Sequence, residues 1–371
     1  MKDIYFDSAA TTPVKPEVLV AMMPYFTDRF YNPNSSYNKA RQVSAEIDKA
    51  RETIARSINA EPEKIIFTSG GSESNCTAIR GFCEKHYKNA RVPSVVATTI
   101  EHHSTLSCLE LVNGQTVGVN EYGYIRKNEL THELLPYFSL LTICGGNNEI
   151  GTIQNIREIA EIAHNNNALL HVDAVQLFGH YPIDVQSMGI DMMSASAHKI
   201  GGPKGVGFLY VKHPDSILPL INGTQEGGLR GGTLNVPGII GFARAVELCD
   251  IINLRQKAMR DYMIAKLQDR FGCKLNGAVG DNRLYNNVNV TFPQDIKAEQ
   301  LIFMLGESNI MCSAGSACNA GNPKPSHVLK AIGLTDEEAQ RTVRFTLPEE
   351  VTQKDIDTAV DMIDAALGLI S

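Results

Sequence analysis

The chain has 371 residues, enough for two domains, and its 34 basic and 41 acidic side chains give a formal net charge of −7. A mildly acidic chain offers no general attraction to phosphate backbones, so we do not expect direct nucleic-acid binding. No apolar stretch approaches the roughly 18 residues that a membrane helix needs, and the start MKDIYFDSAATTPV lacks the apolar core of a signal peptide, so we expect a cytoplasmic protein with no membrane partner.

The first two thirds of the chain alternate between strand and helix patterns. Apolar residues at helical spacing predict helices that contain 78–83 and 156–163. Short apolar runs predict buried strands at 64–68, 94–99, 140–144, 168–173 and 206–211. This order predicts an α/β fold with a mostly parallel sheet flanked by helices on both faces.

The pattern changes after residue 256. Residues 287–292, NVNVTF, alternate like a half-exposed strand. Helices are expected at 298–306 and after two capping-box motifs, Thr335-x-x-Glu338 and Thr352-x-x-Asp355.

We therefore predict a large domain over 12–257 and a smaller α+β domain over 258–371, on which residues 1–11 pack. The longest loop-like tract is 312–326, CSAGSACNAGNPKPS, which is rich in Gly, Ser, Asn and Pro. Tracts of this length without periodicity are often functional or mobile.

A turn of small residues, Thr68-Ser-Gly-Gly-Ser-Glu-Ser-Asn75, connects a predicted strand to a predicted helix. Backbone N–H groups around Gly71 and the positive end of the helix dipole would face a bound anion, and Ser72 adds a hydroxyl donor. The turn is not a Walker motif, because no Gly-Lys-Ser/Thr follows. A plain strand-to-helix turn with an N-cap explains the same residues.

Lys199 follows a small-residue turn, Ser196-Ala-His198, and precedes a glycine-rich stretch. A partly desolvated lysine at the edge of an α/β sheet can form a Schiff base with an aldehyde cofactor. Asp173 ends a predicted strand, and a buried carboxylate there needs a cation such as a protonated pyridine nitrogen. The alternatives are a surface lysine and an aspartate that caps the next helix.

Two further motifs follow predicted strands. In Glu101-His-His-Ser104, His102 could stack on a flat cofactor ring or move protons, or could simply begin a helix. In Asn147-Asn-Glu-Ile-Gly151, side-chain amides could bind a ligand or build a turn.

The eight cysteines include no C-x-x-C pair, which gives a zinc site or a thioredoxin-like motif little support. In a reducing compartment they are expected to be thiols, most of them small buried hydrophobes. Cys318 lies in the loop-like tract, where a thiol could reach into a site, provided that the site supplies a cation or a base. Cys312 competes for this role, although its position after Asn309-Ile-Met311 suggests strand-end packing.

The order and spacing of these motifs resemble the cysteine desulfurases of the class V aminotransferase group, which are fold-type I pyridoxal phosphate enzymes. The long segment around Cys318 is similar to group I, the NifS- and IscS-like subtype. The resemblance covers essentially the whole chain through the motifs already quoted, together with Tyr5-Phe-Asp-Ser-Ala-Ala-Thr-Thr12, His171-Val-Asp-Ala-Val-Gln176, Gly227-Gly-Leu-Arg-Gly-Gly-Thr233, Gly315-Ser-Ala-Cys318 and Val343-Arg-Phe-Thr-Leu347.

The resemblance implies a role for each matching residue. Lys199 would hold pyridoxal 5'-phosphate, Asp173 would pair with its ring nitrogen, and His102 would stack on the ring. Asn148 and Arg344 would hold the substrate carboxylate, for which a guanidinium fork is well suited. The remaining contacts to the ring oxygen and the phosphate would come from Gln176, Gly71, Ser72, Ser196, His198 and, from the partner subunit of a homodimer, Thr233.

The resemblance also implies a reaction. L-cysteine would displace Lys199, which would then remove the Cα proton, and Cys318 would attack the substrate sulfur. Alanine would leave, and the persulfide on Cys318 would pass to a sulfur-acceptor protein such as an iron–sulfur scaffold or another thio-carrier. A selenocysteine lyase, another class V aminotransferase or lyase, and a non-catalytic sulfur-relay or scaffold protein are the alternatives.

Three departures from the family pattern leave open a specialised sulfur acceptor and altered dimer contacts. The acidic–arginine pair that usually precedes Gly-Leu-Arg is Glu226-Gly227 here. A histidine common in the family is replaced by Tyr37. The usual Arg-Phe-Ser-Leu-Gly-Arg becomes Arg344-Phe-Thr-Leu-Pro-Glu349.

Overall fold

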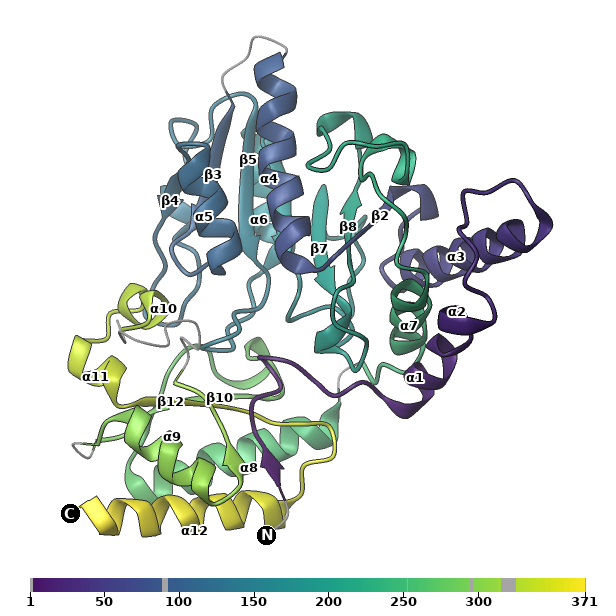
Figure 1. Ribbon diagram of the computed structural model, residues 1–371. Helices are drawn as coiled ribbons and strands as arrows, with labels where there is room; N and C mark the ends of the chain where they lie inside the picture. Colours follow the sequence, from purple (N-terminus) through teal and green to yellow (C-terminus); the bar gives the residue numbers. More distant parts are fainter. Residues whose placement is uncertain (1–2, 89–92, 252, 294–295, 315–324, 371) are drawn as a thin grey trace.

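A computed structural model of the chain describes residues 3–88, 93–251, 253–293, 296–314 and 325–370. Figure 1 shows two units, a large one built on a central sheet and a smaller one that carries both ends of the chain. None of the helices in the described ranges is long and apolar enough to cross a membrane.

The large unit is built on a seven-stranded sheet with the order β2-β8-β7-β6-β5-β3-β4. Neighbouring strands from β7 to β4 run parallel, whereas β8 runs antiparallel to both of its neighbours. The strands are β2 (Ile65–Thr68), β3 (Ser94–Thr98), β4 (Gln115–Val117), β5 (Ser139–Cys144), β6 (Leu169–Asp173), β7 (Met192–Ser196) and β8 (Gly207–Val211). The predicted mostly parallel sheet is confirmed, although β7 was missed because two serines interrupt its apolar pattern.

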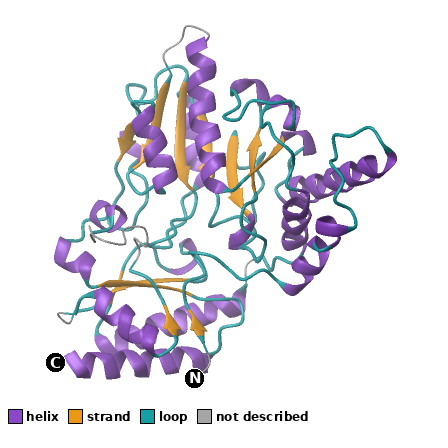
Figure 2. Ribbon diagram, viewed as in Figure 1, coloured by secondary structure: helices purple, strands orange, loops and turns teal. Residues whose placement is uncertain are grey.

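Helices cover both faces of this sheet, as predicted (Figure 2). Alternate strand residues point to opposite faces, so Ile66 packs with the helices on one side and Ile65 and Phe67 with those on the other. One layer consists of α4 (Gly71–Lys88) and α5 (His103–Leu111). The other contains α1 (Pro16–Met22), α3 (Asn38–Ser57), α6 (Ile156–Asn165) and α7 (Val236–Glu247), with the short α2 (Pro24–Thr27) beside α1 and α7.

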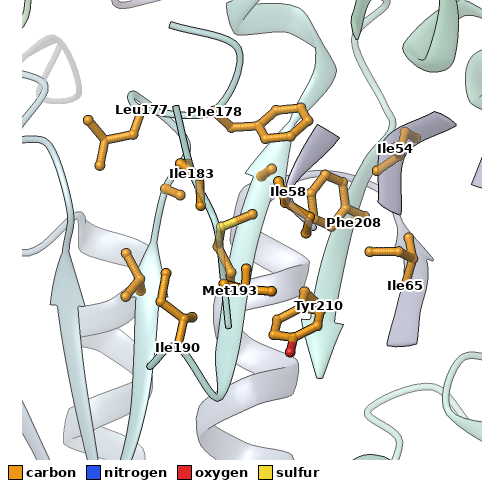
Figure 3. Packing of buried hydrophobic residues seen from close by; sticks show 14 of the residues in the cluster. Ile54, Ile58, Ile65, Leu177, Phe178, Ile183, Ile190, Met193, Phe208 and Tyr210 are labelled. Atoms are coloured by element: carbon orange, nitrogen blue, oxygen red, sulfur yellow. The ribbon is translucent and has the colours of Figure 1, made fainter. Parts of the chain in front are cut away.

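The core of the second layer is closely packed around β7 and β8 (Figure 3). Phe178 and Phe208 meet edge to face, with ring centroids 5.0 Å apart. Ile54 and Ile58, at the end of α3, close the same cluster against the sheet. This rigid layer fixes the strand ends from which the candidate site residues project.

The smaller unit contains a three-stranded antiparallel sheet and a two-stranded parallel pair. Its strands are β9 (Lys274–Leu275), β10 (Asn287–Thr291) and β12 (Thr342–Thr346), and β1 (Ile4–Tyr5) with β11 (Ile310–Met311). Its helices are α8 (Leu254–Phe271), α9 (Ala298–Glu307), α10 (His327–Ala331), α11 (Asp336–Gln340) and α12 (Gln353–Ile370). Because β1 pairs with β11, the N-terminal residues Ile4 and Phe6 lie in the core of this unit.

Both predicted capping boxes are present. Thr335 caps α11 in a reciprocal pair with Glu338, and Thr352 and Asp355 exchange backbone and side-chain hydrogen bonds before α12. The prediction that 287–292 is half-exposed was wrong, since every residue of β10 is buried. Its polar alternation arises because Asn287 and Asn289 donate hydrogen bonds to the Glu149 carbonyl across the interface between the two units.

Single 3₁₀ turns connect several of these elements, and one of them explains a departure from the family pattern. The turns are Pro62–Lys64, Lys127–Glu129, Ala197–Lys199, Pro214–Ser216, Glu226–Gly228 and Gly280–Asn282. Gly227 has φ = 64°, a left-handed conformation that glycine adopts more easily than arginine. Glu226 beside it forms a two-pronged ion pair with Arg51, with N–O distances of 2.8 and 2.7 Å, and accepts a hydrogen bond from the Phe67 N–H.

Replacing Glu226 with alanine is expected to reduce the free energy of unfolding by about 3 kcal/mol, because it leaves Arg51 without its partner in a partly desolvated position. The Glu226 side chain is only 1% exposed and that of Arg51 16%. Chemical denaturation measures the loss, and Glu247→Ala, which removes the exposed pair with Arg244, is the matched control. Equal losses in the two variants would contradict the structural importance of the Arg51–Glu226 pair.

Candidate active site

The candidate site lies where strands β5, β6 and β7 end at the same edge of the large sheet. Parallel strands present their carboxyl ends together, and ligands of open α/β sheets bind there. Cys144, Asp173 and Ser196 are the last residues of these strands, and Cys144 is the register partner of Asp173. Lys199 follows β7 by one 3₁₀ turn, so the sheet topology brings Lys199 and Asp173 to one edge.

Lys199 is partly buried, not a surface lysine. Its Nζ donates to the carbonyl oxygens of Ala9 and Ala10, at 2.6 and 2.8 Å. Burial, together with the smaller effect of the positive charge of Arg344, lowers the pKa of the Lys199 ammonium to about 8. The neutral amine that a nucleophile or proton acceptor requires is therefore more abundant near neutral pH than in an exposed lysine.

Asp173 is 7% exposed and receives two hydrogen bonds. Asn75 Nδ2 donates to Oδ2 at 2.7 Å, and the Val175 N–H donates to Oδ1 at 3.0 Å. Within the described ranges, no basic side chain forms an ion pair with this carboxylate. A buried carboxylate that lacks a cationic partner is suited to a protonated ring nitrogen, so the residues present fit a pyridine cofactor.

His102 is connected to Asp173 through two side chains. The His102 ring caps α5 by accepting a hydrogen bond from the Ser104 N–H, and its Nδ1 lies 2.8 Å from Ser104 Oγ. Asn75 Nδ2, which donates to Asp173, also donates to Ser104 Oγ at 3.0 Å. Burial lowers the pKa of His102, so the imidazole is neutral at physiological pH and presents an uncharged ring.

The predicted phosphate-binding residues lie at the start of α4 and at the end of β7. Gly71 begins α4, and the Cβ that it lacks would lie 2.5 Å from Val175 Cγ2, so only glycine permits this approach. Ser72 is exposed in the first turn, whereas Ser196 is buried. Burial and the charge of Lys199 lower the pKa of His198 to about 4, and its ring lies 3.1 Å from Thr11 Oγ1.

Arg344 lies on β12 and joins the two units at the site. Its guanidinium donates to Asp7 Oδ1 at 2.6 Å and to the Asn148 carbonyl at 3.1 Å. Its Nε is buried and has no hydrogen-bond partner within the described structure. Asn148 itself is half-buried, while the preceding Asn147 builds the turn by accepting from the N–H groups of residues 149 and 150.

For three predicted site residues, the described structure shows no side-chain contact with this cluster. The amide of Gln176 donates to the Ala9 carbonyl at 3.1 Å, beside Lys199. Thr233 is exposed in the segment before α7. Cys318 lies outside the described residues, and the competing Cys312 is packed against the small core, where burial raises the pKa of its thiol to about 12.

A cavity of about 570 Å³ adjoins Lys199. Its wall includes Tyr5, Thr12, Tyr285 and the segment Leu347–Val351. Of the candidate cofactor residues, Lys199 alone lies on this wall. The cofactor site is therefore defined by the polar side chains at the sheet edge and not by this cavity.

Sequence reasoning missed the residues that hold the site residues in place. Asn75 was read as the end of a turn and Asp7 as part of a motif without a role. Glu101, next to His102, is buried, and its Oε1 accepts hydrogen bonds from Thr98 and from the Cys144 N–H. Burial raises the pKa of the Glu101 carboxyl to about 8. Each of these polar residues lies inside one of the sequence motifs, and its partner could be assigned only from the fold.

Replacing Glu101 with glutamine is expected to flatten the decrease of stability with pH. Because the pKa of Glu101 rises from its ordinary value of 4.5 to about 8 on folding, the native state retains a proton that the unfolded chain has lost. Its contribution to the free energy of unfolding is therefore lost progressively as the pH rises from 4.5 to about 8, by about 1.4 kcal/mol per pH unit. Urea denaturation of the wild type and Glu101→Gln across that range tests this, and identical pH slopes would contradict it.

The sheet topology, the lowered pKa of Lys199 and an Asp173 carboxylate that has no basic partner among the described residues define an enzyme of the pyridoxal phosphate-dependent transferase fold. The sequence profile described as aminotransferase class V matches residues 4–359. The chain belongs to the class V aminotransferase family.

Relatives and solved structures agree with this assignment. The chain is 40% identical to a cysteine desulfurase IscS of Methanosarcina thermophila, over 98% of this chain and 91% of the relative. It is 38% identical to a cysteine desulfurase IscS of Dictyoglomus turgidum, over 98% of this chain and 94% of the relative. A NifS-like protein superposes with a TM-score of 0.91 at 32% identity, covering 99% of this chain and all of the other. The structure of SspA in complex with cysteine superposes with a TM-score of 0.82 at 38% identity, covering 94% of this chain and all of the other.

Proposed function

We propose that this protein is a pyridoxal 5'-phosphate-dependent cysteine desulfurase that converts L-cysteine to L-alanine. The observation that carries the proposal is the presence, at one sheet edge, of a lysine of lowered pKa and of a buried carboxylate that has no basic partner in the described part of the chain. Relatives named cysteine desulfurase and a solved relative in complex with cysteine support the choice of substrate.

The residues of the chain divide the chemistry among them. When bound, the cofactor withdraws electron density from the Cα of the amino acid. Asp173 supplies the negative charge that keeps a ring nitrogen protonated, and Asn75 fixes that carboxylate. Lys199, with its lowered pKa, accepts the Cα proton at Nζ. Arg344 offers its fork to the substrate carboxylate at the junction of the two units.

The sulfur step is assigned to Cys318. Its thiolate attacks the substrate sulfur, forms an S–S bond and leaves a persulfide on Cys318, while the carbon–sulfur bond of the substrate breaks and alanine is released. The persulfide passes to an acceptor thiol, which we infer belongs to an iron–sulfur scaffold or another thio-carrier in the cytoplasm. Arg344 supports this placement, because its backbone exchanges hydrogen bonds of 2.7 and 3.1 Å with Ser313, which lies in the same tract.

A homodimer completes the proposed site, with Thr233 of one subunit reaching the phosphate of its partner. Exposure of Thr233 supports this arrangement. Apolar side chains that a monomer would leave in water also favour a second copy, and they cluster in the α1–α2 region at Leu19, Val20, Met23, Phe26 and Phe30. Light scattering of the purified protein should give twice the mass of the chain.

Alanine formation from L-cysteine by the wild type and by Cys318→Ala tests the function directly. The wild type is expected to be yellow, to release alanine and to carry one additional sulfur atom on Cys318 in peptide mass spectra. Cys318→Ala is expected to keep the colour and lose sulfur transfer. Undiminished turnover in Cys318→Ala would contradict the persulfide step, and activity with selenocysteine alone would favour a selenocysteine lyase.

A further inference from the structure

Two cysteines that are far apart in the sequence meet between helices α4 and α5. The sulfur of Cys76 on α4 lies 2.7 Å from that of Cys108 on α5, and both are free thiols. A disulfide requires an S–S distance of about 2.04 Å. An approach of about 0.7 Å by two side chains would therefore close the bond.

The two sulfurs differ in environment. Cys108 is 3% exposed, whereas Cys76 is partly exposed to solvent. The hydrogen bond from Cys108 lowers the pKa of the Cys76 thiol to about 7, against the opposing effect of burial. The same contact raises the pKa of Cys108. Cys76 thus has the accessibility and the thiolate character of an attacking residue, and Cys108 is placed to resolve the product.

The pair also adjoins the network that holds the candidate cofactor residues. Cys76 follows Asn75, which bridges Asp173 and Ser104, and Cys108 lies one helical turn after Ser104. The Cys76 sulfur lies 3.9 Å from the Ser104 carbonyl oxygen. A change in the contact between α4 and α5 at the cysteines therefore acts on the hydrogen bond between Asn75 and Ser104.

We propose that Cys76 and Cys108 form a redox-sensitive dithiol, which a peroxide converts to a disulfide that disturbs the Asn75–Ser104 link and lowers the activity of the enzyme. The Cys76 thiolate attacks the peroxide oxygen, breaks the O–O bond and becomes a sulfenic acid, and hydroxide leaves. The Cys108 sulfur then attacks the Cys76 sulfur, and water leaves with the Cys108 proton. The two thiols lose two electrons and the peroxide gains them. The effect on activity rests on the proposed function, but formation of the disulfide does not.

Peptide mapping tests the disulfide without reference to activity. The cofactor-loaded protein is treated with hydrogen peroxide, then alkylated under denaturing conditions and digested. A cross-linked peptide pair containing Cys76 and Cys108, lighter by two hydrogens than the two free peptides, is expected, while the buried Cys83 and Cys273 remain alkylated. Oxidation of Cys76 to a sulfinic acid without the cross-link, or alkylation of both cysteines, would overturn the proposal.

Activity measurements with a matched variant test the link to the site. Peroxide is expected to reduce wild-type turnover by about tenfold, as a small displacement of site residues can, and dithiothreitol is expected to restore it. The Cys76→Ser variant retains Cys318, so any activity that peroxide removes from this variant reports oxidation at sites other than Cys76. This loss should be clearly smaller than the loss in the wild type. Cys108→Ala provides a second variant if Cys76→Ser folds poorly. If the wild type forms the disulfide but peroxide lowers the activity of wild type and variants equally, the proposed effect on activity is wrong, whereas the proposed disulfide is confirmed.

Discussion

Replacing Lys199 with alanine is expected to reduce alanine formation from L-cysteine by at least about 1,000-fold, because one side chain both anchors the cofactor and moves the substrate proton. The structure accounts for both tasks. Burial holds the pKa of Lys199 at about 8, and the carbonyls of Ala9 and Ala10 hold the amine in place. Removing the amine therefore removes a nucleophile and a base together.

The measurement for Lys199→Ala has two parts. Turnover is followed as alanine release, and covalent attachment of the cofactor is followed by borohydride reduction and mass spectrometry, which should label the wild type and not the variant. Lys204→Ala is the matched control, since Lys204 is an exposed lysine on the next turn of the chain. Turnover in Lys199→Ala within tenfold of the wild type would contradict its assignment as anchor and base.

The pKa of Lys199 also sets the direction of a pH effect on the reaction. Since the ordinary value of 10.5 is lowered to about 8 by burial, the neutral amine becomes more abundant as the pH rises from 7 towards 8. The rate of the initial reaction between the cofactor and the apoprotein should rise over the same range. The lowered pKa of Lys199 depends on burial in the folded protein, so the unfolded chain should lack it.

The sequence was sufficient to predict the alternation of strands and helices in the large unit, because strands buried on both faces are continuous apolar runs. It also placed Asp173 at the end of such a run, whereas the strand before Lys199 was missed, and the roles of both residues stay predictions. It failed for β10, where Asn287 and Asn289 are buried polar residues whose partner is a carbonyl in the other unit. Polar residues with distant partners carry no local sign of burial.

The same reason explains the supporting residues that were missed. Asn75, Ser104 and Asp173 come from three separate elements and meet only through the order of the strands and the packing of α4 and α5. The Cys76–Cys108 contact depends on that same packing, and a search for C-x-x-C spacing could not find it. Spacing rules detect sites within one segment, whereas this site is assembled from several.

A departure from the family pattern also acquires a structural explanation. Glu349 stands where arginine is usual, and its carboxylate pairs with Lys15 at 2.8 Å between the small and the large unit. The reversed charge at position 349 is therefore matched by a basic residue at the domain junction. The Lys15–Glu349 pair therefore indicates that this departure changes the contact between the two units and leaves the candidate catalytic residues unchanged.

Replacing Arg344 with alanine is expected to raise the KM for L-cysteine by about 100-fold or more, because two charge-assisted hydrogen bonds to the substrate carboxylate are worth about 3 kcal/mol or more. Arg344 is only 2% exposed, and its Nε has no hydrogen-bond partner among the described residues. Steady-state kinetics should show a larger effect on KM than on kcat. Arg344→Lys should recover part of the affinity, since it restores the charge without the planar fork.

Asp7 separates substrate binding from structural support in this test. Asp7 accepts from the Arg344 guanidinium at 2.6 Å, so its replacement by asparagine weakens the support of Arg344 and leaves the arginine charge free. Asp7→Asn is therefore expected to lower thermal stability without raising KM as Arg344→Ala does. If Asp7→Asn and Arg344→Ala raised KM equally, the role of Arg344 would be to stabilise the junction between the units. If only Arg344→Ala does so, the guanidinium contacts the substrate carboxylate.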